Sequence, residues 1–290
     1  MEKKKVYKKR SQTAAIFRRL RKNKLAMAGA VVLLVLILLA LFADVIADYS
    51  TDVIGHNMEE RVQKPSAEHW FGTDQYGRDV FARIVHGTRI SLSLALFSML
   101  VAVALGAILG AVSAYYGGTV DEIIMRIMDV LMSIPPMLMS ITIVAALGQN
   151  MINLMVALSI AYIPLFARVI RSSILSIKGQ EFIEAAKCCG TSDARIIFKH
   201  ILPNAVGPIL VQSTLAMGSV ILTISSLSFI GLGVKPPQPE WGTMLYDARM
   251  LFRHQPYLSL FPGAIIAITV LSLNMLGDGF RDAIDPRLKN

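Results

Sequence analysis

The sequence predicts an all-α integral membrane protein with six transmembrane helices. Hydrophobic residues make up 54% of the chain and the mean hydropathy is +0.55, values typical of a membrane protein. Several uncharged runs are long enough to supply the ~20 apolar residues that one helical span requires. The alternation of polar and apolar residues that a transmembrane β-barrel needs is absent, and helices satisfy their backbone hydrogen bonds internally.

The chain begins with a basic arm, residues 1–24, which we expect on the cytoplasmic side. Within this arm, Thr13 to Lys24 mixes apolar and basic residues in the pattern of an amphipathic elbow helix that lies in the lipid headgroup layer. The first transmembrane helix is expected at 25–47. No convincing cleavage site lies at its exit, Asp44 to Asp48, so we expect a retained anchor and not a signal peptide.

The other five spans are expected in a core that covers residues 90–290. Each span is assigned from an uncharged run, and Gly148-Gln149-Asn150 divides the longest run into a hairpin of two helices. The runs, in chain order, are Leu25–Ala43, Ile90–Val120, Val130–Ala167, Ile201–Val234 and His254–Gly277. The sizeable soluble segment is then the extracytoplasmic "outer loop" 48–89, which is too short to form a domain with its own core.

The distribution of Lys and Arg sets the expected orientation. With the N-terminus inside, the inner segments hold 21 of the 29 basic residues and the outer segments hold eight. The inner segments are 1–24, 116–127, 168–204 and 278–290, and the outer segments are 48–89, 148–152 and 233–253. We therefore expect both termini and the loop 168–204 in the cytoplasm. The net charge of +9 is then a topology signal. No nucleic-acid partner is expected, because the basic arm adjoins a span and lacks a nucleic-acid-binding motif.

The cytoplasmic loop 168–204 is predicted to hold two short helices joined by a sharp turn. The first, Gln180 to Cys189, contains no Gly or Pro, and small or apolar residues recur on one side of it at three- and four-residue spacing. They are Phe182, Ala185, Ala186 and Cys189. Gly190 is placed to end this helix in a left-handed conformation.

A second helix is expected to begin at Ser192, whose side chain would cap it, with Asp193 in the favourable first turn. Pro203 is expected to stop this helix, because proline cannot donate a backbone hydrogen bond. The spacing alone leaves two interpretations open. The segment is either a docking site for another protein or a surface helical hairpin without a partner.

The same loop resembles the signature loop of the permease subunits of ATP-binding-cassette (ABC) importers. That signature reads Glu-Ala-Ala, three residues, Gly, nine residues, Ile, one residue and Leu-Pro. The matching residues here are Glu184, Ala185, Ala186, Gly190, Leu202 and Pro203. His200 departs from the general Ile, and together with Asn204 it resembles the dipeptide and oligopeptide branch. The resemblance implies a type I ABC importer permease fold, with 168–204 as the loop that couples to an ATPase subunit.

The outer loop resembles the same branch of the family. It contains Gly72-Thr73-Asp74 and Gly77-Arg78-Asp79, similar to the Gly-Thr-Asp and Gly-Arg-Asp segment of dipeptide and oligopeptide permeases. Asp74, Arg78 and Asp79 are therefore candidates for docking an extracytoplasmic solute-binding protein. The alternative is that they pair with one another and cap the second span. Trp70 and Phe71 are expected at the membrane interface.

The fifth span carries a stripe of polar residues that is a candidate lining for the translocation path. Its members, at spacings of seven, four and three along one side of a helix, are Gln212, Ser219, Thr223 and Ser226. Apolar residues, Leu215 and Leu222 among them, are expected on other sides. The alternative is helix–helix contact, for which Ser and Thr are ordinary residues in membranes.

Several other kinds of site are not expected. The phosphate-binding motif Gly-x-x-x-x-Gly-Lys-Ser/Thr does not occur, so this chain alone is not expected to hydrolyse ATP. The five His residues lack metal-ligand spacing, and no catalytic group of residues is found. Cys188 and Cys189 are adjacent, which disfavours a disulfide between them. No acid or base lies within 130–167 or 201–234, which counts against a proton-coupled carrier, the main alternative class.

The resemblance also implies partners. They are a second, related permease subunit that completes a heterodimeric pore, two ABC ATPase subunits that hold ATP and Mg, a solute-binding protein and membrane lipid. No cofactor is expected in this chain. The expected location is the cytoplasmic membrane of a bacterium or archaeon, and the expected solute is a dipeptide or oligopeptide. Nickel chelates, glutathione and other solutes are the alternatives within the family.

Overall fold

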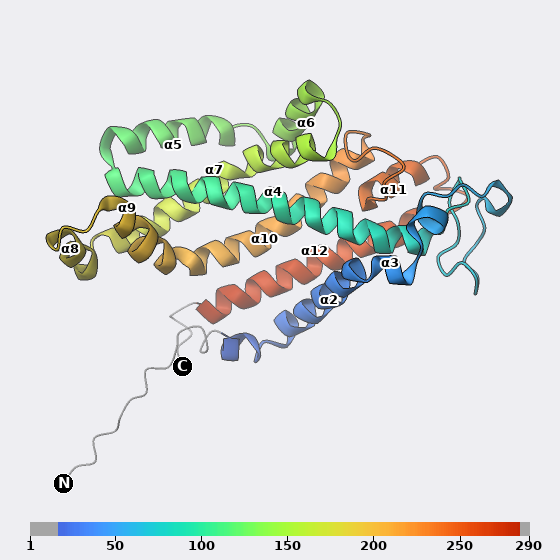
Figure 1. The fold of residues 1–290 in the computed structure, drawn as a ribbon, viewed down its shortest axis with the longest axis horizontal. Helices are drawn as coiled ribbons and strands as arrows, with labels where there is room; N and C mark the ends of the chain where they lie inside the picture. The colour runs from blue at the N-terminus through green and yellow to red at the C-terminus, as the bar shows by residue number, and fades with distance from the viewer. Residues whose placement is uncertain (1–16, 285–290) are drawn as a thin grey trace, which may run out of the picture.

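The computed structural model describes residues 17–284, which are mostly helical (Figure 1). The predicted arm 1–24 falls largely outside these residues, and Phe17–Leu20 is the helical part of the expected elbow helix. The named helical elements are α2 (Lys24–Leu41), α3 (Ala43–Ile46), η1 (Tyr49–Val53), η2 (Met58–Glu60), α4 (Val80–Tyr116), α5 (Gly118–Met132), α6 (Pro136–Leu147), α7 (Met151–Lys178), α8 (Glu181–Cys188), α9 (Asp193–Arg195), η3 (Ile196–Ile201), α10 (Leu202–Phe229), α11 (Trp241–Ala248) and α12 (Tyr257–Ile284).

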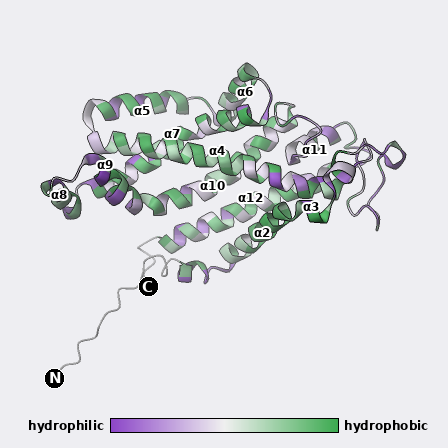
Figure 2. Ribbon diagram, viewed as in Figure 1, coloured by the Kyte–Doolittle hydropathy of each residue, from purple (hydrophilic) through white to green (hydrophobic). Residues whose placement is uncertain are grey.

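Long helices that run roughly along one axis form the body of the molecule (Figure 1). The short helices α8 and α9 lie at one end, and α3, α11 and the outer loop lie at the other. Hydrophobic residues dominate the middle of the long helices, and hydrophilic residues gather toward the two ends (Figure 2). Within residues 17–284, five helices are long and apolar enough to cross a membrane, and counting the bent pair of α5 and α6 as one span raises the number to six. The predicted all-α membrane fold is confirmed.

The pairing of α4 with α7 is the most extensive helix contact in the fold. Gly106 and Gly110 on α4 make it possible, because a side chain at either position would collide with α7. An added Cβ would lie 2.6 Å from Phe166 Cβ at Gly106 and 2.4 Å from the Ala167 carbonyl oxygen at Gly110. Small residues that allow this close approach are a common device of membrane helices. On the other side of the bundle, α2 packs along α12.

The second span begins ten residues earlier than the sequence suggested, at Val80 and not at Ile90. Asp79 sets this start, since its side chain accepts a hydrogen bond from the Ala82 N–H at 2.8 Å. The charged residues of α4 that argued for a loop pair with acidic residues on other parts of the chain. Arg89, for example, lies 2.9 Å from Asp44. The outer loop therefore ends at Asp79, and its predicted last ten residues are helical.

The third span is broken, where the sequence suggested one helix entered from a loop at 116–127. That expected loop is mostly part of α5, and α6 turns away from α5 by 86°. The break lies at Ser133–Pro135, where two consecutive prolines follow Ile134. Proline disfavours helical geometry in the residue before it and lacks an N–H donor, so the helix ends there.

The predicted hairpin between the third and fourth spans is present at Gly148-Gln149-Asn150. The Asn150 side chain caps α7 by accepting a hydrogen bond from the Asn153 N–H at 2.8 Å. Gln149 donates to the Gly231 carbonyl oxygen at 2.8 Å and so joins this turn to the end of α10. The last two spans, α10 and α12, overlap the predicted runs, but α12 extends beyond Gly277 to Ile284.

Candidate coupling loop, outer loop and translocation path

The first helix of the predicted coupling loop, α8, has one fully buried residue. Ile183 is 0% exposed, whereas Glu184 and Ala185 are exposed and Ala186 is half-buried. The side predicted from spacing is mostly exposed, since Phe182, Ala185 and Cys189 are exposed and Ala186 is half-buried. The Glu-Ala-Ala segment presents a charged and a small residue outward.

The turn after α8 has the geometry predicted for Gly190. Its φ is +68°, a conformation that residues with a Cβ adopt only at a cost. The Gly190 N–H donates to the Lys187 carbonyl oxygen at 2.9 Å, and the Thr191 N–H donates to the Ala186 carbonyl oxygen at 3.1 Å. These two bonds form a Schellman motif, which satisfies the last carbonyl groups of the helix. The signature glycine thus fixes the direction in which the chain leaves α8.

The second part of the loop differs from the prediction in two ways. Ser192 occupies the N-cap position of α9, but its side chain accepts no hydrogen bond there. Pro203 does not stop a helix, because α9, η3 and α10 form one continuous helical stretch.

The π-helical turn η3 explains how Pro203 is accommodated. It shifts the hydrogen-bond register, so that the Leu202 N–H donates to the Ile197 carbonyl oxygen. Pro203 then falls in the first turn of α10, where its missing N–H costs little. The two residues typical of the peptide branch also meet here, since the Asn204 side chain donates to the His200 carbonyl oxygen at 2.6 Å.

Two of the predicted docking residues in the outer loop lie inside an ion-pair network. Arg78 is 2% exposed, and its Nε lies 2.7 Å from Asp74 Oδ2. Its Nη2 reaches Asp247 Oδ2 at 3.3 Å, so that the outer loop is joined to α11. Asp74 and Arg78 pair with each other, as the structural alternative in the sequence analysis described. Their role in docking stays a prediction.

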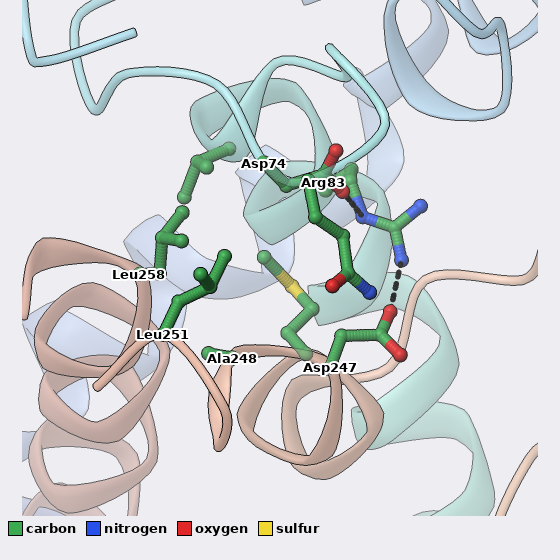
Figure 3. A pocket seen from close by; sticks show the side chains of 9 residues that line it. Asp74, Arg83, Asp247, Ala248, Leu251 and Leu258 are labelled. Atoms are coloured by element: carbon green, nitrogen blue, oxygen red, sulfur yellow. Dashed lines mark ion pairs between the residues drawn. The ribbon is translucent and has the colours of Figure 1, made fainter. Parts of the chain in front are cut away.

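Arg83 completes this network as a second buried arginine that the sequence analysis did not select. It lies between Asp74 and Asp247, with nitrogen–oxygen distances of 3.7 and 4.0 Å, beside an apolar wall of α11 and α12 residues (Figure 3). Two arginines and two aspartates balance in charge. Burial raises the pKa of Asp247, and the coulombic effects of Arg83 and Arg78 oppose that shift. Removal of one member would leave buried charge without its partner.

Asp79, the third predicted docking residue, serves as the cap of α4. Its Oδ2 atom also lies 2.8 Å from His69 Nδ1. Phe71 packs against Phe261 with ring centroids 4.0 Å apart, whereas Trp70 is exposed. The segment from His69 to Asp79 thus closes on itself and on the adjacent helices.

The polar stripe on α10 lies on a partly open side of the helix. Ser219 is exposed, and Gln212, Thr223 and Ser226 are half-buried. Thr223 donates to the Ser219 carbonyl oxygen at 2.9 Å, and its hydroxyl lies 3.4 Å from that of Tyr162 on α7. Leu222, expected on another side, is 47% exposed and shares this face. This side of α10 is only partly covered by other helices. A role of the four positions in the path stays a prediction.

Comparison with known proteins shows the family to which the chain belongs. Residues 102–290 match the model of the binding-protein-dependent transport system inner membrane component, and residues 11–65 match that of the N-terminal transmembrane domain of oligopeptide transport permease C. The dipeptide transport system permease protein DppC of Alkalihalophilus pseudofirmus is 46% identical, over 94% of this chain and 90% of that protein. The chain belongs to the binding-protein-dependent transport permeases.

Other permeases extend this comparison. The glutathione transport system permease protein GsiD of Pectobacterium atrosepticum is 43% identical over 94% of this chain and 91% of that protein. Among solved structures, the MetNI methionine ABC transporter in an inward-facing conformation matches 70% of this chain and 97% of its own, with 17% identity and a TM-score of 0.58. This permease therefore has the type I ABC importer permease fold and is a multi-pass inner-membrane protein.

Proposed function

We propose that this permease forms half of a peptide-conducting pore and that loop 168–204 is where an ABC ATPase subunit docks. The observation that carries the proposal is the turn at Gly190. It presents the exposed Glu184 and Ala185 at one end of the bundle, while Ile183 is the fully buried residue of α8. A short helix with an exposed charged edge and little buried surface of its own is suited to seat in a partner.

The cycle that follows from this arrangement needs partners for every energetic step. A solute-binding protein delivers the solute to the outer loop end. ATP binding closes two ATPase subunits and draws together the coupling loops of this chain and of a second, related permease subunit. The pore then opens outward, and hydrolysis resets it. In this cycle the chain supplies a coupling loop and half of the pore, and the partners supply the catalytic residues.

Dipeptides and oligopeptides are the proposed solutes. A permease named for dipeptides is 46% identical to this chain and one named for glutathione is 43% identical. Dipeptides and glutathione share peptide bonds and free carboxylates. The candidate stripe on α10 offers neutral amide and hydroxyl groups and no fixed charge, a lining that lets varied peptides pass without holding any of them tightly. Glutathione is the second candidate solute.

Transport by the reconstituted complex tests the proposal. The permease is copurified with its partner subunits, placed in vesicles and supplied with binding protein and labelled dipeptide or glutathione. Uptake should require ATP and should persist when an ionophore collapses the proton gradient. Uptake that follows the proton gradient without ATP would instead support a secondary carrier. Mass spectrometry of the ligand that copurifies with the binding protein identifies the solute.

A further inference from the structure

The coupling-loop end of α4 is bonded directly to the coupling loop. The Tyr115 hydroxyl donates to Asp193 Oδ1 in α9 at 2.6 Å, and Tyr115 is 7% exposed. Lys187 of α8 places its ammonium group 5.3 Å from the centroid of the same ring. A charge-assisted hydrogen bond and a cation–π contact therefore hold both short helices of the loop to one side chain. Five residues, Cys188 to Ser192, separate Lys187 from Asp193, and Gly190 is the middle one.

Two further contacts make this end of α4 a junction. Lys178, the last residue of α7, donates to the Ala114 carbonyl oxygen at 3.0 Å. The Ser113 hydroxyl donates to Asp121 of α5. Three consecutive residues of α4 thus contact α5, the end of α7 and the coupling loop. The loop is also joined covalently to α7 and α10, so α4 is a separate, non-covalent route out of it.

Among the long helices of the core, α4 is the one best suited to carry a displacement without bending. It runs for 37 residues without a proline, a length of about 55 Å at the α-helical rise per residue. By contrast, α7, α10 and α12 each contain an interior proline, and α5 and α6 are bent at theirs. Interior prolines remove a backbone hydrogen bond and favour kinks.

The opposite end of α4 is joined to the start of α11 by hydrogen bonds. Ser91 donates to Glu240 Oε1 at 3.3 Å, and the Trp241 indole N–H donates to the Ile84 carbonyl oxygen at 3.3 Å. Glu240 and Trp241 are both fully buried, and Arg83 of α4 pairs with Asp247. The helix therefore connects the coupling loop to α11 at the opposite end of the bundle.

We propose that Tyr115 is a positioning residue that transmits displacement of the coupling loop to α4 and, through α4, to α11. This inference rests on the proposed function, because it requires that an ATPase moves the loop. The Tyr115 hydroxyl fixes α9 to the end of a stiff helix, so that movement of the loop displaces α4 along with the covalently attached α7 and α10.

The test compares Tyr115→Phe with Tyr116→Phe in the full complex in lipid nanodiscs. Each change removes one hydroxyl from adjacent residues, but Tyr116 is 55% exposed and its hydroxyl has no partner among residues 17–284. ATP turnover is measured without and with binding protein plus dipeptide, together with the KM for ATP, the melting temperature and the amount of copurified ATPase subunit.

Tyr115→Phe is expected to lower the increment of turnover that binding protein and dipeptide add by about tenfold, the factor that corresponds to losing one hydrogen bond to a charged group. Basal turnover and the KM for ATP should stay near those of the parent. Asp193→Asn should have a similar effect, and the double variant should be no worse than either single one, since both changes weaken the same bond. Tyr116→Phe should resemble the parent.

Full stimulation in Tyr115→Phe would overturn the inference, as would additive effects of the two changes. Loss of copurified ATPase subunits would also overturn it, because Tyr115 would then serve assembly. A Glu184→Lys variant measured in parallel tests the proposed coupling loop separately from the proposed role of Tyr115. If Glu184→Lys uncouples transport and Tyr115→Phe does not, the loop couples but α4 is not its route. If Glu184→Lys leaves transport intact, the proposed coupling loop itself is wrong.

Discussion

Arg171 on α7 holds Asp121 on α5 in a bidentate ion pair. The Arg171 Nε and Nη2 atoms lie 2.6 and 2.5 Å from the two oxygens of the Asp121 carboxylate. Ser113 of α4 donates to the same carboxylate, so one acidic side chain joins three helices. Forked geometry of this kind is available to arginine and not to lysine. The pair therefore fixes α5, the first half of the broken span, against the α4–α7 core.

We predict that Asp121→Asn destabilises the protein by about 1–3 kcal/mol, the cost of leaving a partly buried charged donor without its partner. The measurement is thermal unfolding of the purified permease in nanodiscs. Asp129→Asn is the matched control, because Asp129 pairs with Arg168 on the same two helices but both side chains are 51% exposed. Its cost should be at most about 1 kcal/mol. Equal melting of the two variants would contradict the role given to Asp121.

The variant Gly190→Ala tests the backbone conformation at this turn without introducing a steric clash. A Cβ added at this residue would meet no atom within 4 Å, so the cost of Gly190→Ala comes from its φ of +68° alone. We expect about 1–2 kcal/mol for forcing a non-glycine residue into this region. Gly190→Pro should be more harmful, since proline also removes the N–H that donates to Lys187. Peptide uptake should fall in the order parent, Ala variant, Pro variant, while membrane insertion stays normal.

Glu184→Lys tests docking without altering the turn. Glu184 is exposed and makes no ion pair within residues 17–284, so reversal of its charge should leave the fold and the copurified partner permease unchanged. Uptake and solute-stimulated ATP turnover should fall together, because the reversed charge meets the ATPase surface. Ala at the same position should have a smaller effect. Normal uptake by the Lys variant would remove the case for this helix as the coupling element.

The outer loop gives a prediction in which fold and docking compete. Arg78→Glu places a third acid beside Asp74 and Asp247 in a buried network, and breaking such a network costs about 3–5 kcal/mol. We expect a lower melting temperature in this variant. If Arg78 also meets the binding protein, docking should weaken beyond the loss of folded protein and become more sensitive to salt. A variant that melts early but docks normally per folded molecule would assign Arg78 to structure alone.

The apolar runs are sufficient to predict six spans, because a transmembrane helix requires a length and a hydrophobicity that can be read from consecutive residues. The turn at Gly190 was predictable for a similar reason, since one residue type suits a left-handed helix end. The start of α4 was misplaced because Arg83 and Arg89 are charged. Their partners Asp247 and Asp44 lie far away along the chain, so no local pattern shows that these two arginines are paired.

The effect of each proline also depends on the hydrogen-bond register around it, which the sequence alone does not show. Pro135 and Pro136 break the third span, whereas Pro203 lies within a continuous helical stretch because η3 shifts the register just before it. The Tyr115–Asp193 bond joins residues 78 positions apart. A signal for it was present, since Tyr115 stands at the end of an apolar run opposite a polar loop, but a tyrosine at a membrane boundary is common enough to carry little weight.

The polar stripe on α10 provides the last prediction, through single cysteines at Gln212, Ser219, Thr223 and Ser226. Cys188 and Cys189 are free and exposed, so they must first be replaced by serine. A water-soluble thiol reagent reacts with thiolate, which forms where water is present. If the stripe lines the path, its members should label, and labelling should change when the ATPase subunits are trapped with nucleotide.

Two neighbours on α10 supply the dry controls. Val220 and Ile224 are buried and follow Ser219 and Thr223 directly, so cysteines there should resist the reagent in both states. Leu222 is a third comparison, because its exposed side chain shares the face of the stripe. Labelling at Leu222 with the stripe would mean that water wets the whole face as a path does. Protection of all stripe positions in both states would mean that this face packs against lipid or a second permease, and that the path lies on other spans.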